Sequence, residues 1–107
     1  MFTRETAIEQ ATNLVLDCLK YGIDIDKAIM FGSVAKNNLK ETSDIDIALV
    51  SSQFANNFVY NTRLTSRINI KYPLIEVHHF NSEYFKNGDP FIDEITSTGF
   101  QIDFCKK

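Results

Sequence analysis

The sequence has little cysteine, no strongly basic run and no long apolar run, and each shortage narrows the classes of protein it can belong to. Its two cysteines, Cys18 and Cys105, lie far apart without metal-binding spacing, which favours free thiols in a cytosolic protein and leaves a disulfide open. No apolar run approaches the roughly 18 residues that span a membrane, and the amino terminus does not resemble a signal peptide. We therefore expect a cytoplasmic protein that is neither exported nor embedded in a membrane.

The charge balance argues against a general nucleic-acid-binding protein. The chain of 107 residues carries 11 basic and 14 acidic side chains, which gives a formal net charge of −3. Broad attraction to a phosphate backbone needs a basic excess, so no general nucleic-acid binding is expected, although a local basic patch stays open.

Arg63, Arg67 and Lys71 recur at helical spacing on one exposed face. Such a face is usually solvated, and its alternative use is to dock an acidic partner.

Length and composition predict one compact domain over residues 1–107. The chain is 44% hydrophobic, and nine Phe and four Tyr supply much of the expected core. A chain of this size buries roughly two-thirds of the surface that its unfolded form exposes. No repeat, linker or low-complexity segment divides it.

The periodicity of apolar residues predicts an order of helices and strands. Spacings of three to four predict helices over 3–21, 34–39, 54–71 and 90–98, and alternation predicts strands over 28–31, 44–50, 74–80 and 100–104. Thr3 or Thr6 is the expected N-cap of the first helix, and Asp89 that of the last, with Pro90 at its first position. Residues 81–85 are expected to form an N-capped turn.

The stretch from Phe31 to Val50 carries the residues that suggest chemistry. Gly32 and Ser33 follow one predicted strand, and Asp44 and Asp46 open the next. Because side chains alternate along a strand, both aspartates project from one face while the isoleucines beside them point to the core. Two adjacent carboxylates repel each other unless a cation lies between them, and Mg2+ prefers such oxygen ligands.

The glycine turn complements the carboxylates. Gly32 has no side chain, so backbone can approach a phosphate closely, and a helix starting near Ser33 would direct free N–H groups at an anion. The Ser33 hydroxyl can donate to a phosphate oxygen. Lys36, one short turn later, either meets a phosphate or is a solvated surface lysine, and both interpretations stay open. Together these residues indicate a site for a metal-bound nucleoside triphosphate.

Each part of this pattern also has a structural interpretation. Ser33 can be a helix N-cap, and the Ser-Asp pair that ends at Asp44 often marks a turn. The combination at this spacing favours the functional interpretation. A second Asp-x-Asp, at Asp24 and Asp26, directly follows a helix stop without an upstream Gly-Ser, so we interpret it as a solvated turn and not as a metal site.

A third carboxylate lies on the predicted strand over 74–80. Alternation places Glu76 and His78 on one face and His79 on the other. If this strand lies beside the one that bears Asp44 and Asp46, Glu76 completes a three-carboxylate cluster; the alternative is an edge-strand glutamate in water. His78 can contact phosphate or transfer a proton, but a hydrogen-bonded structural histidine is the favoured interpretation, and His79 has no stronger claim.

The pattern Gly32-Ser33, ten residues, then Asp44-x-Asp46 resembles the signature of the DNA polymerase beta nucleotidyltransferase superfamily, in particular its minimal nucleotidyltransferases. Residues 74–80 resemble the strand that carries that family's third carboxylate, and the similarity continues over 89–103, so it covers nearly the whole chain. The resemblance implies an α+β (mixed α/β) fold, a mixed sheet with helices packed against it. The chain departs from many relatives in having Val34 where a basic residue follows Gly-Ser, and Glu76 in place of an aspartate.

The resemblance also implies a function. It predicts metal-dependent transfer of a nucleoside monophosphate, AMP from ATP or another NTP, to an acceptor hydroxyl. Asp44, Asp46 and Glu76 would be the catalytic residues and hold two Mg2+ ions, with Mn2+ as a substitute. Gly32, Ser33 and Lys36 would bind the triphosphate.

The acceptor is expected on another protein, because such a small chain offers little beyond the metal and phosphate site. Minimal members of the family often pair with a helical toxin of the HEPN type and act as antitoxins, some by transferring AMP to a toxin tyrosine. One alternative is a non-catalytic module that neutralises its partner by contact. Another is a small-molecule acceptor such as an antibiotic hydroxyl. The sequence leaves the acceptor, the preferred nucleotide and self-association into homo-oligomers open.

Overall fold

The computed structural model describes residues 3–32 and 45–104. The predicted helix over 34–39 and the candidate site residues Ser33, Lys36 and Asp44 lie outside this part of the chain, as does Cys105. The helices and strands along the chain are α1 (Arg4–Lys20), β1 (Lys27–Phe31), β2 (Ile45–Ser51), α2 (Phe58–Asn69), β3 (Ile75–Asn81), α3 (Ser82–Asn87), α4 (Pro90–Thr98) and β4 (Phe100–Gln101).

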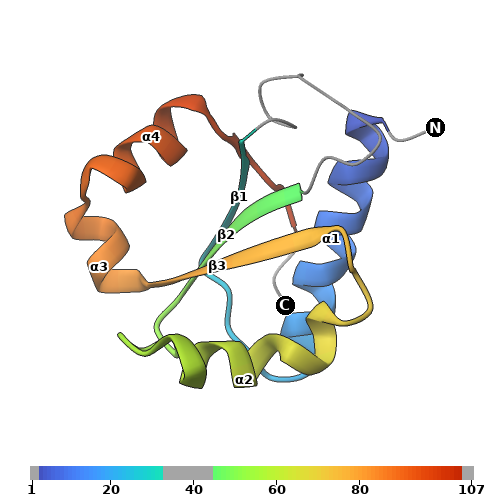
Figure 1. Cartoon of the computed structure of the whole chain (residues 1–107), viewed down its shortest axis with the longest axis horizontal. Helices are drawn as coiled ribbons and strands as arrows, with labels where there is room; N and C mark the ends of the chain where they lie inside the picture. Colours follow the sequence, from blue (N-terminus) through green and yellow to red (C-terminus); the bar gives the residue numbers. More distant parts are fainter. Residues whose placement is uncertain (1–2, 33–44, 105–107) are drawn as a thin grey trace.

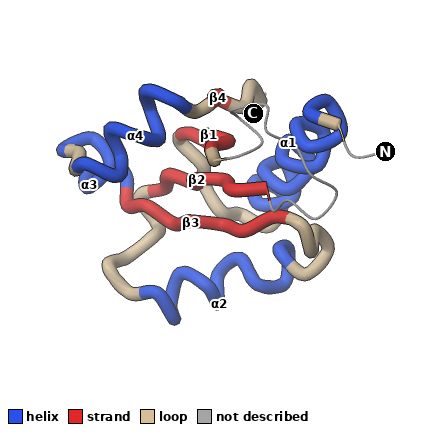
Figure 2. Tube along the Cα trace, turned by 45° about the horizontal axis from the view of Figure 1, so that its top comes forward, coloured by secondary structure: helices blue, strands red, loops and turns tan. Residues whose placement is uncertain are grey.

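The four strands form one mixed sheet in the order β3-β2-β1-β4 (Figure 2). Strand β1 pairs antiparallel with β2 and with β4, whereas β2 pairs parallel with β3. A parallel pair needs a crossover connection, and α2 provides it. Helices α1 and α2 lie on one side of the sheet and α3 and α4 on the other (Figure 1). The expected α+β class, with helices packed against a mixed sheet, is therefore confirmed.

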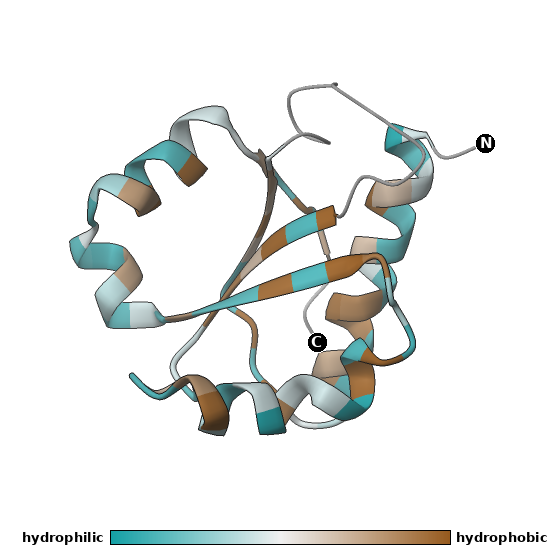
Figure 3. Cartoon of the chain, viewed as in Figure 1, coloured by the Kyte–Doolittle hydropathy of each residue, from teal (hydrophilic) through white to brown (hydrophobic). Residues whose placement is uncertain are grey.

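Alternation along β2 separates two hydrophobic clusters. Figure 3 shows hydrophilic bands between the hydrophobic ones along β2 and β3. Every second residue from Ile45 to Leu49 joins the larger cluster, which also buries the apolar side of α1. Ala48 and Val50 join the smaller cluster beneath α3 and α4. Asp46 shares the face of Ala48, but it is only half-buried. Strand β2 thus presents one carboxylate on a face that is otherwise apolar along this strand.

Helix α2 begins at Phe58, and the predicted start at Phe54 is wrong. The Phe54 side chain is fully buried in the larger cluster. The side-chain amide of Asn61 accepts from the Ala55 N–H at 2.8 Å and donates to the Ala55 carbonyl at 2.7 Å. These bonds satisfy the backbone in a non-helical conformation, so the helix starts only after this segment.

The predicted helix caps are confirmed, whereas the last strand is shorter than predicted. The Thr3 side chain accepts from the Thr6 N–H, and the Asp89 side chain accepts from the Ile92 N–H at the start of α4. Asn81 caps a complete short helix, α3, where only a capped turn was expected. Strand β4 covers Phe100–Gln101 and not the whole of 100–104, because the chain then turns Ile102 into the larger cluster.

Two surface features match their sequence interpretation. Asp24 and Asp26 are exposed in the connection between α1 and β1, as expected for a turn. Arg63, Arg67 and Lys71 are exposed too, although Lys71 lies beyond the end of α2, with its Nζ 5.7 Å from the centre of the Tyr21 ring. Among the described residues, no helix is both long enough and apolar enough to cross a membrane.

Cys18 is a core thiol that we expect to be inert in the folded protein. It is fully buried in the larger cluster. Burial, and to a lesser degree the charge of Asp17, raises its pKa to about 12. Alkylation needs both access and the thiolate, so iodoacetamide should modify Cys18 in denaturant but not in native buffer. Mass spectrometry of the tryptic peptide between Arg4 and Lys20 measures this thiol alone. Modification in native buffer at the rate of a free thiol would contradict this burial.

Candidate functional site

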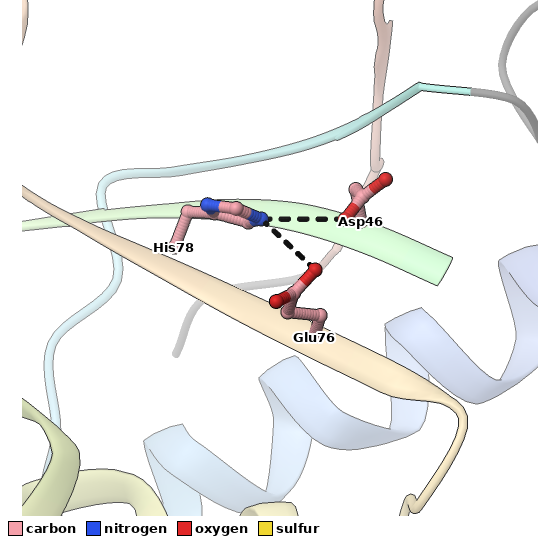
Figure 4. Close-up of side chains that lie close together, drawn as sticks. All are labelled: Asp46, Glu76 and His78. Carbon is pink, nitrogen blue, oxygen red and sulfur yellow. Dashed lines mark hydrogen bonds and ion pairs between the residues drawn. The ribbon is translucent and has the colours of Figure 1, made fainter. Parts of the chain in front are cut away.

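The side chains of Asp46, Glu76 and His78 meet on the open end of the sheet face that α3 and α4 partly cover (Figure 4). The parallel register of β2 and β3 pairs Asp46 directly with Glu76. His78 follows Glu76 by two residues and therefore projects from the same face. Its Nε2 lies 3.3 Å from Asp46 Oδ1 and 3.7 Å from Glu76 Oε2. One potential ligand atom from each residue lies within 4.8 Å of the other two.

The cluster is open to solvent and carries an excess of negative charge. The side chains of Asp46, Glu76 and His78 are 25%, 62% and 30% exposed, so a small ion or a phosphate can reach them. Within residues 3–32 and 45–104, no lysine or arginine pairs with either carboxylate. An imidazole N–H can donate to only one carboxylate at a time. The remaining negative charge therefore favours a cation.

Gly32 closes one side of the cluster. Its φ is +78°, in the left-handed region, and a Cβ at this position would lie 2.5 Å from Asp46 Oδ2. That distance is far shorter than any real contact, so a side chain here would displace the carboxylate. The positive φ favours glycine, and the close approach means that any other residue would have to shift the Asp46 carboxylate. The end of β1 thus lies directly against the carboxylate of β2.

The structure brings together three of the six residues that the sequence singled out: Gly32, Asp46 and Glu76. Two carboxylates and one imidazole, beside backbone that no Cβ obstructs, are a donor set that fits a divalent cation. The other three candidates, Ser33, Lys36 and Asp44, lie outside the described residues.

Aromatic side chains hold the His78 ring in place. The ring centroid of His78 lies 5.0 Å from that of Phe31 and 6.2 Å from that of Phe91, both in edge-to-face contact. Phe31 and Phe91 contact each other at 5.7 Å. Sequence reasoning did not single out Phe31 or Phe91 for the site. The predicted elements contained no signal that the first turn of α4 would pack beside the carboxylate strands.

His79, the next residue, has a structural environment on the other face of β3. Its Nε2 lies 2.8 Å from Thr65 Oγ1, and its ring packs edge-on against Phe54 at 4.9 Å. Burial, and secondly the neighbouring His78, lowers its pKa to about 4, so the ring is neutral near pH 7. Strand alternation thus separates a core histidine from one that faces the carboxylates.

A small sheet domain with in-register carboxylates beside a glycine turn defines the class of nucleotidyltransferase-type domains. The family "Polymerase beta, Nucleotidyltransferase" matches residues 14–104. Because this match spans most of the chain, the protein belongs to that family. A search of curated protein sequences finds no match.

Solved structures share the fold at low sequence identity. A candidate nucleotidyltransferase from Sulfolobus solfataricus superposes with a TM-score of 0.70 at 16% identity, covering 92% of this chain and 80% of that chain. A toxin–antitoxin structure with AMP-PNP gives a TM-score of 0.60 at 16% identity, and the match covers 89% of this chain and 74% of that chain. A mutant MntA–HpeT toxin–antitoxin structure gives a TM-score of 0.57 at 14% identity, again with 89% of this chain and 74% of that chain covered. These likenesses support the fold.

Proposed function

We propose that this protein is a metal-dependent nucleotidyltransferase that transfers a nucleoside monophosphate, AMP from ATP, to an acceptor hydroxyl. The observation that carries the proposal is the pairing of Asp46 with Glu76 across two parallel strands, with Gly32 against the Asp46 carboxylate. Family membership supports the reaction class.

In this proposal Asp46 and Glu76, together with Asp44, hold the divalent cations, Mg2+ or Mn2+. Bound metal would neutralise charge on the triphosphate and favour ionisation of the attacking hydroxyl. The protein's own contribution is positioning, because nucleotidyl transfer needs no covalent enzyme nucleophile. Ring contacts with Phe31 and Phe91 restrain the His78 side chain beside the carboxylates.

Gly32, Ser33 and Lys36 are proposed to bind the triphosphate. Gly32 supports this role because its missing side chain leaves backbone next to Asp46 accessible. A phosphate there would lie near the carboxylates that hold the metal, which is the arrangement that metal-bound ATP requires. Ser33 and Lys36 would add a hydroxyl donor and a positive charge.

We propose a protein acceptor, a toxin of the HEPN type, with this chain as its antitoxin. Two structures of similar fold are toxin–antitoxin complexes, and one contains AMP-PNP. Helix α2 and its C-cap expose large apolar side chains, with Phe58 78%, Val59 58% and Ile70 80% exposed. Phe58, Ile70 and Glu76 line one cavity of about 620 Å³ between α2 and β3. Exposed apolar side chains that gather in this way are typical of protein interfaces.

A calorimetric titration with a non-hydrolysable ATP analogue tests the nucleotide site. We expect the wild-type protein to bind the analogue in the presence of Mg2+ or Mn2+ and not in EDTA. The variant Glu76→Gln keeps the side-chain size but removes one ligand charge, so its affinity should fall at least about tenfold. Glu94→Gln, the same change at an exposed position of α4, is the matched control and should bind like wild type.

Two results would count against catalysis. If the ATP analogue binds equally well with and without metal, the carboxylates do not hold a metal that binds the nucleotide. No binding under any condition would leave contact-mediated neutralisation of a partner as the better function, to be tested by the inhibition of a co-purified partner.

A further inference from the structure

We infer that His78 is itself a metal ligand and that the Asp46, Glu76 and His78 site selects Mn2+ over Mg2+ more strongly than an all-carboxylate site would. This inference rests on the proposed function for the presence of a metal, and it specifies which class of divalent ion the site takes. Three observations carry it: the distances of His78 Nε2, the packing of its ring and the contrast with His79.

The distances are compatible with a shared ion, because the hydrogen bond between His78 Nε2 and Asp46 Oδ1 is long. A charge-assisted N–H···O bond measures about 2.7–2.9 Å. The Nε2 atom of His78 lies 3.3 Å from Asp46 and 3.7 Å from Glu76. Adjacent ligands of an octahedral ion with bonds of about 2.1 Å are about 3.0 Å apart, and opposite ligands about 4.2 Å. Both separations at His78 fall between these limits, and the three ligand atoms lie within 4.8 Å of one another, so all three side chains are near enough to bind one ion once they adjust.

The His78 ring is also oriented in advance. Edge-to-face contacts with Phe31 and Phe91 restrain the ring, and its Nε2 is the nitrogen that points at both carboxylates. A ligand whose direction is fixed by packing loses little freedom when an ion binds. The neighbouring carboxylates supply the charge, and the neutral imidazole supplies the nitrogen.

The two neighbouring histidines of β3 have different polar partners. His79 finds a neutral hydroxyl partner, Thr65, at 2.8 Å and is buried against Phe54. Among the described residues, the polar partners of His78 are the two carboxylates, and its ring packs against two phenylalanines. His78 therefore shares the aromatic packing of His79 but has carboxylates where His79 has a neutral hydroxyl.

Ligand chemistry determines which ion such a site prefers. Mg2+ binds oxygen ligands in octahedral geometry and retains water rather than nitrogen, whereas imidazole suits later divalent metals. Mn2+ accepts both carboxylate and imidazole ligands. Without His78 the site should therefore lose affinity for Mn2+, about tenfold, while its affinity for Mg2+ stays nearly unchanged.

Electron paramagnetic resonance of Mn2+, without nucleotide, tests this inference. We expect wild-type protein to bind Mn2+ with a pulsed-EPR modulation from one imidazole nitrogen, and Mg2+ to displace it only at excess. In His78→Ala the nitrogen signal should disappear and Mn2+ affinity fall about tenfold, with Mg2+ affinity changed less than twofold. If His78→Ala does not fold, the nitrogen signal of the wild-type protein by itself shows whether an imidazole binds Mn2+. Asp46→Asn is the control that should weaken both ions.

Three results overturn the inference: no Mn2+ binding to the wild type, bound Mn2+ without a nitrogen signal, or equal losses of both ions in His78→Ala. These outcomes are separable from failure of the proposed function. If nucleotide binding depends on metal but bound Mn2+ shows no nitrogen ligand, His78 is not a metal ligand and the transferase proposal stands. If Mn2+ has a nitrogen ligand but the protein binds no nucleotide, His78 is a metal ligand and the transferase proposal fails.

Discussion

Replacing Asp46 by Asn should lower nucleotide transfer by about a thousandfold while leaving the protein folded. Asp46 contributes a carboxylate to the proposed metal site and pairs with Glu76. Asparagine keeps the shape but removes the charge that holds a cation. If metal stabilises the transition state by several kcal/mol, loss of about 4 kcal/mol corresponds to about three orders of magnitude in rate.

The assay follows the covalent transfer of label from α-labelled ATP to the proposed acceptor protein, together with release of labelled pyrophosphate from γ-labelled ATP. Asp103→Asn makes the same chemical change at an exposed position away from the cluster and should react like wild type. Circular dichroism and thermal unfolding establish that each variant is folded. An Asp46→Asn protein with more than a tenth of the wild-type rate would show that this carboxylate does not hold the catalytic metal.

Replacing Gly32 by Ala should disable the site through geometry alone. The new Cβ would lie 2.5 Å from Asp46 Oδ2, so the carboxylate must leave its present position beside Glu76 and His78. The positive φ of +78° adds a backbone cost of about 1–2 kcal/mol. We expect Mn2+ affinity to fall more than tenfold, with a moderate loss of unfolding free energy in urea.

Gly22→Ala is the matched control for this prediction. Gly22 has a similar φ of +85°, but an added Cβ meets nothing within 4 Å. Both variants therefore carry a comparable backbone strain, and Gly32→Ala alone collides with the site. Gly22→Ala should lose a similar amount of stability and keep the metal affinity of the wild type. If both variants bind metal equally, the close approach of Gly32 to Asp46 does not matter for metal binding.

The parts of the fold that could be predicted were those fixed by local periodicity. Strand alternation placed Glu76 and His78 on one face from sequence alone, because that rule depends only on backbone geometry. Asp89 and Pro90 identified the start of α4 for the same local reason. What the sequence did not determine was that β2 and β3 would be parallel neighbours, a non-local choice that decides whether Glu76 meets Asp46.

Side-chain interactions account for the main errors. The start of α2 was misplaced because the side chain of Asn61 satisfies the backbone of Ala55, a bond invisible to apolar spacing. Nothing in the sequence indicated that the His78 Nε2 would lie beside two carboxylates. The favoured interpretation of His78 as a hydrogen-bonded histidine is compatible with the structure, in which His78 Nε2 and Asp46 Oδ1 share a hydrogen bond at 3.3 Å. Phe91, which packs against the His78 ring, approaches from α4 only in the folded chain.

The parallel pairing of β2 and β3 links the site to folding itself. Asp46 and His78 are 32 residues apart in sequence and meet only after the α2 crossover has closed. Closing such a long loop has an entropic cost, and a partly folded chain therefore lacks the cluster. An ion that binds only the native state shifts the folding equilibrium, by about 2.7 kcal/mol at a hundred times its Kd. Under the proposed function, the supply of divalent ion would therefore help to set the folded fraction of this small protein.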